Sequence, residues 1–269
     1  MKLFIFFFLH IFYNKVYCID SFCPFMSSKE WIYKQKTWNN NKVIYKCITN
    51  NYDNSLKPKY LNYDYDYILF SDNYFNDDYS IWEFYPIPNE VNKLNLSAVK
   101  IERYIKINAH KCLPSKYNFS IFIDGNIIIK NDINLLINEL EYKLGKYQFY
   151  VPQHPQRNCL YEEIQAVLDL KKDTFSSLFP QIEKFIKDGF PHKFGLPETN
   201  VLIRYHLKPN IIKLMNDWWK ILYSGSHRDQ LSFSYVAWKN INIKFAYFNN
   251  KIYKQYFLRI PHKKIKRKK

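Results

Sequence analysis

The stretch Ser120–Lys130 reads SIFIDGNIIIK and places Asp124, Gly125 and Asn126 between two apolar, β-branched runs. Such runs are typical of buried strands, and Asp-Gly and Gly-Asn pairs are typical of the tight turn in a β-hairpin. A carboxylate and an amide two residues apart can also offer oxygens to a hard cation such as Mn²⁺ or Mg²⁺. The motif alone therefore leaves both a turn and a metal site open.

Polar residues also follow two other expected strands. Asp72 comes after the strand predicted at 64–70, and the loop 50–53, which holds Asn50, Asn51 and Asp53, follows the strand predicted at 42–49. Ligands of open α/β sheets bind beyond the carboxyl ends of the strands. We therefore expect these residues to form one polar rim together with Asp124.

A basic stripe precedes the motif. The spacing of apolar residues predicts a helix over 97–113 with Ser97 as its N-cap. Arg103, Lys106 and His110 stand three and four residues apart on it, so they are predicted to share one helical face. Such a face can bind a diphosphate, the arginine as a fork and the lysine as a point charge. A solvated basic face is the alternative.

Three later clusters could also carry chemistry. His154 and Arg157 follow a predicted strand, and Glu162 and Glu163 open a predicted helix. With Asp229, these glutamates are available as paired carboxylates for glycoside hydrolysis. The others are Arg204 with His206, and Arg228, Asp229 and Gln230 at a helix start. Serine or cysteine catalysis is not indicated, because the chain has no G-x-S-x-G elbow and Cys159 has no local activator.

The elements needed to position these residues alternate along the chain. The hydrophobic pattern predicts strands at 42–49, 64–70, 81–87, 119–123, 147–152, 199–206 and 241–248, and helices at 97–113, 133–144, 160–172, 174–189, 208–225 and 228–240. This order indicates a single Rossmann-like α/β domain with a mostly parallel central sheet flanked by helices. We place that domain at 43–250, after a lead-in segment at 19–42.

Charge and the chain ends bear on partners and localisation. Residues 1–18 have a basic start and an apolar run, which predicts a signal peptide or a signal anchor and hence a secreted or secretory-pathway (ER or Golgi lumen) protein. The net charge is +16, but seven of the positive charges fall within 259–269. We therefore expect no nucleic-acid partner, and we read 251–269 as a basic tail that could contact a membrane surface.

Six ordered blocks resemble a known family. They are YKCITNNYD, DYDYILFSD, RYIKINAHKCLPSKYNFSIFIDGNIII, HPQRNCLYEE, GLPETNVLIRYH and SHRDQLSFSYVAWK, and they span Tyr45 to Lys239. This order is similar to the glycosyltransferase-like domain of plant mucilage-related and turgor-regulation proteins and of bacterial polysaccharide loci. The resemblance implies a nucleotide-diphospho-sugar transferase fold of the GT-A kind. Asn50-Asn51 departs from the Gly-Gly usual there, and Asn is the next residue to tolerate positive φ.

The resemblance implies a metal-dependent glycosyltransferase that uses Mn²⁺ or Mg²⁺ and moves a sugar from a nucleotide-diphospho-sugar to a glycan or lipid-linked acceptor. D-x-N then stands in for the metal-binding D-x-D motif. The expected metal ligands are Asp124 and Asn126, with a histidine, His206 or else His154, completing the shell. The expected donor-binding residues are Asn50, Asn51, Asp53, Asp72, Arg103, Lys106, His110, His154, Arg157, Arg204, Arg228 and Gln230.

Asp229 is the expected acceptor-side base or hydrogen-bond acceptor, and Glu162 and Glu163 are further candidate catalytic residues. Two other classes of function stay open. One is a hydrolase of a ceramide-like lipid amide or a glycan that uses the same site to activate water. The other is a non-catalytic module that binds nucleotides or sugars.

Overall fold

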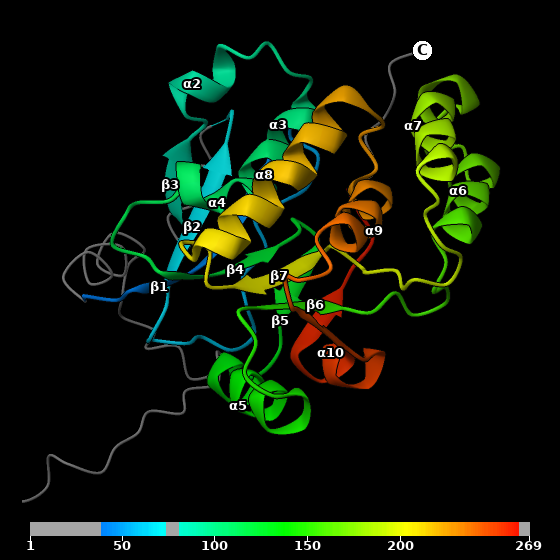
Figure 1. Cartoon of the computed structure of the whole chain (residues 1–269). Coiled ribbons are helices and arrows are strands. Elements are labelled where there is room, and N and C mark those ends of the chain that lie inside the picture. Colours follow the sequence, from blue (N-terminus) through cyan, green and yellow to red (C-terminus); the bar gives the residue numbers. More distant parts are fainter. Residues whose placement is uncertain (1–38, 74–80, 264–269) are drawn as a thin grey trace, which may run out of the picture.

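The computed structural model describes residues 39–73 and 81–263, so the predicted signal segment and most of the lead-in lie outside the described residues (Figure 1). The strands are β1 (Lys42–Ile48), β2 (Asp66–Ser71), β3 (Glu83–Pro86), β4 (Phe119–Ile123), β5 (Ile127–Ile129), β6 (Phe149–Pro152), β7 (Val201–Arg204), β8 (Ala246–Phe248) and β9 (Phe257–Arg259). The helices are α2 (Asn89–Asn92), α3 (Ala98–Ile107), α4 (Ala109–Cys112), α5 (Ile133–Leu144), α6 (Leu160–Asp169), α7 (Phe175–Lys187), α8 (Pro209–Ser224), α9 (Asp229–Lys239) and α10 (Asn250–Tyr256).

Seven of the described strands form one sheet in the order β3-β2-β1-β4-β7-β6-β8. The pairs from β3 to β4 are parallel, as is β6 with β8, whereas β7 runs antiparallel to both β4 and β6. The predicted α/β domain with a mostly parallel sheet is confirmed. The reversal at β7 has a consequence for the site, because the end of β7 lies at the opposite edge from the end of β4.

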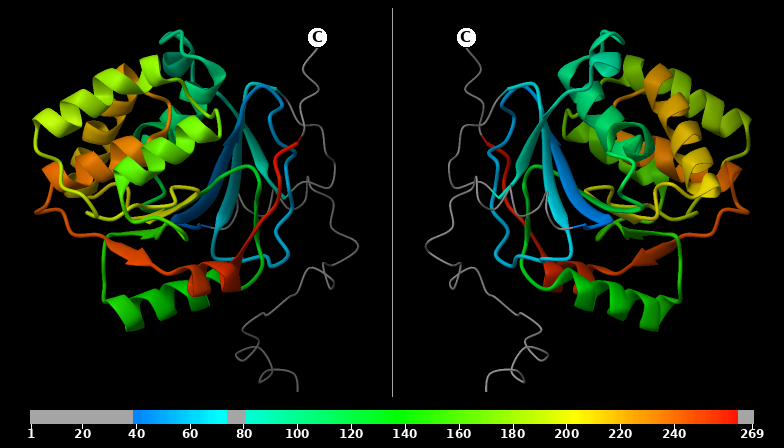
Figure 2. Two further views of the ribbon diagram at one scale, coloured as in Figure 1. Left: turned by 90° about the vertical axis from the view of Figure 1, so that its right-hand side faces the viewer. Right: turned by 90° about the vertical axis from the view of Figure 1, so that its left-hand side faces the viewer.

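Helices cover both faces of the sheet, as Figures 1 and 2 show. The side chains of β1 alternate between two cores because successive residues of a strand point to opposite faces. Val43 and Tyr45 pack with α3, α8 and α9 on one face. Ile44 and Ile48 pack with α5 and α10 on the other. Both faces of the central strands are therefore buried, which explains their continuous apolar sequences.

The DGN segment does not close a hairpin. β4 and β5 do not pair with each other; β4 pairs with β1 and β7, and β5 pairs antiparallel with β9. The prediction that this segment is the turn of a β-hairpin is therefore wrong. The sequence 251–269, expected to be a tail, instead forms α10 and β9 and continues in described structure to Lys263. The final residues 264–269 lie outside the described part.

The predicted helix over 97–113 is two helices. Ser97 caps α3 as expected by accepting a hydrogen bond from the Lys100 N–H. The helix then ends at Asn108, from which the short α4 starts. Asn108 holds this break through hydrogen bonds from its backbone and side-chain nitrogens to the carbonyl of Tyr104. Across 39–73 and 81–263, none of the helices has the length and hydropathy needed for a membrane span.

Candidate functional site

The predicted polar rim forms at the carboxyl ends of β1, β2 and β4, which the parallel register aligns. Asn50 and Asn51 follow β1 with φ angles of 53° and 51°, so asparagine does adopt the positive φ expected at these positions. The Asp72 carboxylate accepts hydrogen bonds from the Asn50 N–H, the shorter of 2.9 Å. Asp72 therefore fixes the loop after β1 and leaves both asparagine side chains exposed to a ligand.

Gly125 is needed for close packing rather than for a positive φ. A Cβ at this position would lie 2.9 Å from Asp53 Oδ2, 3.1 Å from Asp53 Cβ and 3.2 Å from Ile48 Cγ1. Its φ is not in the left-handed region. The loop after β1 and the turn after β4 thus touch at this glycine, and the absence of a side chain brings Asp53 against the Asp124–Asn126 segment.

The C-terminal segment closes over the same turn. Asn126 exchanges backbone and side-chain contacts with Ile260: its carbonyl accepts from the Ile260 N–H, and its Nδ2 donates to the Ile260 carbonyl over 2.8 Å. His262 then lies 2.9 Å from Asp53 Oδ2 through Nδ1, and its ring lies 4.9 Å from that of Tyr52. Figure 2 shows this last described stretch beside the loop after β1.

These contacts set the orientation of the His262 ring. Asp53 can accept only from a protonated Nδ1, so in the neutral ring Nε2 carries the lone pair; Nε2 lies 3.4 Å from Asn126 Nδ2. When a histidine binds a metal through one ring nitrogen, the other ring nitrogen usually donates a hydrogen bond to a carboxylate or carbonyl that orients the ring. The sequence prediction missed His262, because an exposed-looking histidine in a basic run carries no local sign of a site.

Buried charges surround the other side of Asp124. Lys106 Nζ lies 3.2 Å from Asp124 Oδ1 and 2.6 Å from Asp229 Oδ2, and Arg103 Nε lies 3.5 Å from Asp229 Oδ2. Thr199 Oγ1 also donates to Asp229 Oδ2 over 2.9 Å. Burial alone would raise the pKa of Asp229, but Arg103 and Lys106 bring it well below the ordinary value. Asp229 is thus a fixed counter-ion, which makes it a poor general base.

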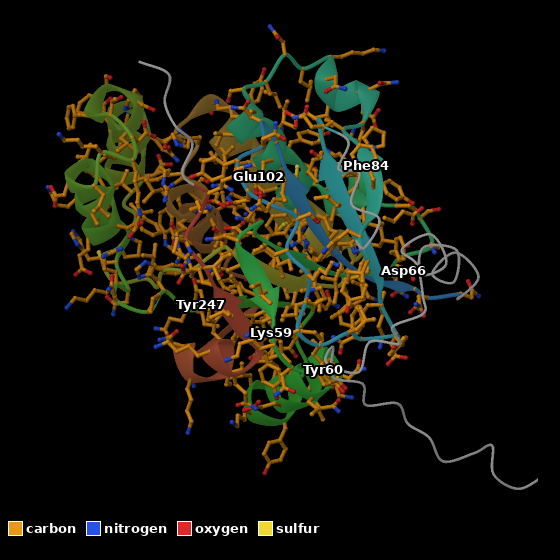
Figure 3. All side chains as sticks on the ribbon, turned by 180° about the vertical axis from the view of Figure 1, so that it is seen from behind. Lys59, Tyr60, Asp66, Phe84, Glu102 and Tyr247 are labelled. Atoms are coloured by element: carbon orange, nitrogen blue, oxygen red, sulfur yellow. The ribbon has the colours of Figure 1, made fainter. Side chains whose placement is uncertain are left out.

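Glu102 on α3, labelled in Figure 3, joins this cluster and was not predicted. Its carboxylate pairs with the guanidinium of Arg103. Burial raises the pKa of Glu102 to about 7 against the opposing effect of Arg103 and Lys106. A carboxyl group of that acidity can gain and lose a proton near neutral pH. Glu102 was not predicted because it is one of several charged residues on a helix that also carries apolar residues, and no motif marks it.

A second cluster lies past the end of β6. Arg157 Nε donates to Glu163 Oε2 over 2.6 Å, and His154 Nε2 lies 3.8 Å from the same oxygen. Glu163 is therefore buried in an ion pair, whereas Glu162 is exposed on the outside of α6. The expectation of a catalytic carboxylate pair from Glu162 and Glu163 is wrong, because adjacent helical residues point about 100° apart.

The structure separates three predicted residues from the rim. Arg204 is fully buried, and its guanidinium contacts the hydroxyl of Tyr45 and the carbonyl of Lys106, so it stabilises the end of α3 inside the core. His206 is buried beyond the end of β7, and the pairing of Ser120 with Arg204 places that end beside the start of β4. His110 lies on α4 against Asn216.

These positions correct three expectations. His206 lies at the edge of the sheet away from Asp124, so it does not complete a metal site there, and Arg204 and His110 do not reach the rim where a donor would bind. The cause for His206 and Arg204 is the antiparallel direction of β7, which a hydrophobic pattern does not reveal. For His110 the cause is the helix break at Asn108.

Gln230 and Arg228 stay near the charged cluster. The Gln230 N–H donates to Asp229 Oδ1, and Gln230 Nε2 donates to the carbonyl of Pro197 over 3.3 Å. Arg228 is the residue before α9 and interacts electrostatically with Asp229 and Lys172. Both therefore lie on the β7 side of Asp124 rather than on the β1–β2 side.

The residues present fit a hard cation through mixed ligands. No group of three His, Cys, Asp or Glu side chains suited to a metal occurs within 39–73 and 81–263. Asp124 retains an oxygen not used by Lys106, Asn126 uses its amide nitrogen for Ile260, and His262 turns Nε2 toward Asn126. A carboxylate, an amide oxygen and an imidazole nitrogen can together bind Mn²⁺, with phosphate oxygens completing its shell.

Comparison with known proteins gives a family. No curated protein matches the sequence. Among solved structures, mouse xyloside xylosyltransferase 1 aligns with a TM-score of 0.43 at 11% identity and covers 78% of this chain and 84% of that one. Galactosyltransferase LgtC aligns with a TM-score of 0.41 at 10% identity over 78% and 74% of the two chains. The mannosyltransferase Ktr4p from S. cerevisiae aligns with a TM-score of 0.38 at 13% identity over 82% and 71%.

The family match rests on sequence and spans nearly all of the described residues. The TOD1/MUCI70, glycosyltransferase-like domain family matches residues 33–262, which include every residue of the rim and extend to His262. The protein therefore belongs to the TOD1/MUCI70 glycosyltransferase-like domain family.

Proposed function

We propose that the protein is a metal-dependent glycosyltransferase that moves a sugar from a nucleotide-diphospho-sugar to a hydroxyl group of a glycan or lipid-linked acceptor. The observation that carries the proposal is the meeting of Asp124, Asn126 and His262 at the carboxyl end of β4. Lys106 contacts Asp124 and Asp53 contacts His262, so two of the three side chains are held by charged neighbours. Membership of a glycosyltransferase-like domain family supports a transferase activity at this site.

A bound Mn²⁺ or Mg²⁺ would neutralise the charge of the leaving diphosphate. Asp124, Asn126 and His262 would hold it, which replaces the His206 of the sequence prediction. Asp53 holds the imidazole of His262 in one orientation. Lys106, charged and buried beside Asp124, adds positive potential on the diphosphate side, while Arg103 is shared between Glu102 and Asp229.

The nucleoside would lie over the loop after β1. Asn50 and Asn51 expose their side chains there, and Asp72 fixes the loop from the end of β2. For the acceptor hydroxyl, Glu102 replaces Asp229 as the candidate proton acceptor, because Asp229 is already paired with Lys106. Asp229 then acts as a positioning residue that holds Lys106 against Asp124.

Nucleotide binding gives the first test. A thermal-shift screen of UDP- and GDP-sugars on the full chain, with and without Mn²⁺, should show stabilisation that requires the metal, since a ligand that binds the folded state raises its melting temperature. Asp124→Asn should remove that stabilisation. Asp169→Asn, an exposed control on α6, should keep it.

Turnover then separates transfer from the other two classes. Release of nucleoside diphosphate that rises when an acceptor is added supports a transferase. Cleavage of ceramide with no nucleotide present would replace the proposal with a hydrolase, and tight binding without turnover would replace it with a binding module. Residues 1–18 motivate a secretory-pathway location, which signal cleavage on expression in eukaryotic cells would test.

A further inference from the structure

A group of basic side chains lies between β6, α6, α9 and β9, outside the metal rim. It contains Arg157, Lys172, Arg228 and Arg259, with Glu163 and Glu198 as its carboxylates. Arg157 pairs with Glu163 over 2.6 Å, and Arg259 pairs with Glu198. The chain thus gathers residues from four separate segments at one place, which we call the basic cluster.

The basic cluster has more positive than negative charge. The four cations face Glu163 and Glu198, which are already paired, and Arg228 also interacts with Asp229, which is paired with Lys106. Lys172 and Arg228 form no ion pair with any described carboxylate closer than 4.0 Å, and Nε of Arg228 is buried without a hydrogen-bond partner. Partial desolvation by its neighbours, together with the cations Arg228, Arg259 and Arg157, lowers the pKa of Lys172. An anion placed among them would relieve this repulsion.

The place of the basic cluster distinguishes it from the donor phosphates. The loop for the nucleoside follows β1 and β2, on one side of β4. The basic cluster follows β6 and reaches β9, on the other side of β4, and Glu198 lies close enough to Asp124 to interact electrostatically. A line along the sheet edge therefore runs from nucleoside to metal to basic cluster.

In a nucleotide-diphospho-sugar the sugar lies beyond the diphosphate from the nucleoside, so an acceptor that receives the sugar can bind on that side of the metal rim. We propose that the basic cluster binds an anionic group of the acceptor, a carboxylate or a phosphate, next to the hydroxyl that receives the sugar. This rests on the proposed function and assigns the acceptor to an acidic class. It also assigns Arg157 and Arg228 to binding the acceptor rather than the donor.

The chemistry of the residues agrees with this assignment. Arginine offers paired donors that match carboxylate and phosphate oxygens. Arg157 is held in place by Glu163, with side-chain exposure of 24%, so a planar donor group is available without large rearrangement. Lys172 is exposed and adds a mobile point charge at the entrance.

The test measures acceptor-like probes directly. Glucose, glucuronic acid and glucose 6-phosphate are titrated into the full chain by ligand-observed NMR, with UDP and Mn²⁺ held at saturation so that the donor site is blocked. The acidic probe that fits should bind at least about tenfold more tightly than glucose, as charged hydrogen bonds allow. Preference for glucuronic acid identifies a carboxylate, and preference for glucose 6-phosphate identifies a phosphate.

Variants locate the effect. Lys172→Gln should weaken binding of the preferred acidic probe by about fivefold or more, whereas Lys187→Gln, the same change at an exposed residue of α7, should leave it within about twofold. Equal binding of all three probes, or equal effects of the two variants, would overturn the proposal. So would anion binding that appears only when UDP is omitted, because it would then belong to the donor site.

The outcome is separable from that of the proposed function. Failure of every nucleotide to bind would remove the transferase proposal while the acidic probes could still bind. Nucleotide turnover with an acceptor, combined with no preference for acidic probes, would leave the transferase and remove only the acidic acceptor.

Discussion

Asp229→Asn is the change that most directly tests the charge arrangement behind Asp124. Asp229 is 3% exposed, its partner Lys106 is 1% exposed, and their charged atoms lie 2.6 Å apart. Asparagine keeps the size of the side chain and a hydrogen-bond acceptor for Thr199, but removes the negative charge. Lys106 then keeps its ion pair with Asp124, at 3.2 Å.

The expected loss of stability is large. Removing one partner of a buried ion pair leaves the other charge only partly compensated, here by Asp124, which costs about 3–5 kcal/mol. Domains of this size lose about 2–4 °C in melting temperature for each kcal/mol, so the expected fall is roughly 6–20 °C. The full loss of stability in Asp229→Asn should be measurable at pH 7, because the lowered pKa of Asp229 keeps the carboxylate of the unmodified protein charged until well into the acid range.

Urea unfolding at pH 7 measures the change, with the double variant Lys106→Met plus Asp229→Asn as the decisive comparison. Removing both charges should cost less than the sum of the two single changes by about 1–3 kcal/mol. Asp217→Asn is the control, because its pair with Lys213 is exposed and is worth less than about 1 kcal/mol. A loss below about 1 kcal/mol in Asp229→Asn, or additive effects in the double variant, would refute the reasoning.

Three shorter predictions concern the rim and the core. Gly125→Ala should cost about 1–3 kcal/mol, since its Cβ would lie 2.9 Å from Asp53 Oδ2; a melting temperature equal to that of the unmodified chain would contradict the close packing. Asp53→Asn should weaken Mn²⁺ binding by about 10- to 100-fold through loss of the support for His262, as titration calorimetry in the presence of UDP would show; unchanged affinity would remove His262 from the proposed metal site. Burial, with Arg204, lowers the pKa of His206 from 6.5 to about 3, so the folded state favours the neutral ring. The neutral ring therefore contributes fully to the folding stability above pH 6.5, and this contribution is lost as the pH falls below 6.5. From pH 6.5 to 5 this costs about 2 kcal/mol, and urea unfolding should show that His206→Gln lacks this part of the acid destabilisation.

Much of the fold follows from the hydrophobic pattern. The strand expected at 119–123 and the helix at 133–144 occur with those bounds, because long apolar runs and strict periodicity are the most reliable signals in a sequence. The rim was also predictable, because carboxyl ends of parallel strands meet at one edge. Strand direction was not predictable, and the reversal of β7 is what moved Arg204 and His206 to the other edge.

Contacts between distant segments were also beyond local sequence signals. The pairing of β5 with β9 joins residues that are far apart in the chain, and a three-residue strand is too short to have a recognisable period. His262 and Glu102 lacked any motif of their own, and they enter the site only through tertiary contacts with Asp53 and Arg103. Asp229 was placed near the site correctly, but its role depended on neighbours that spacing does not show.

The position of β9 also constrains when the site can exist during synthesis. Asp53, Asp124 and Asn126 belong to the first half of the chain, but Ile260 and His262, which contact them, are made after the whole central sheet. All seven strands of the sheet are therefore synthesised before the residues that close the rim. A chain that ends before Ile260 therefore lacks the contacts of Ile260 and His262 that close the rim.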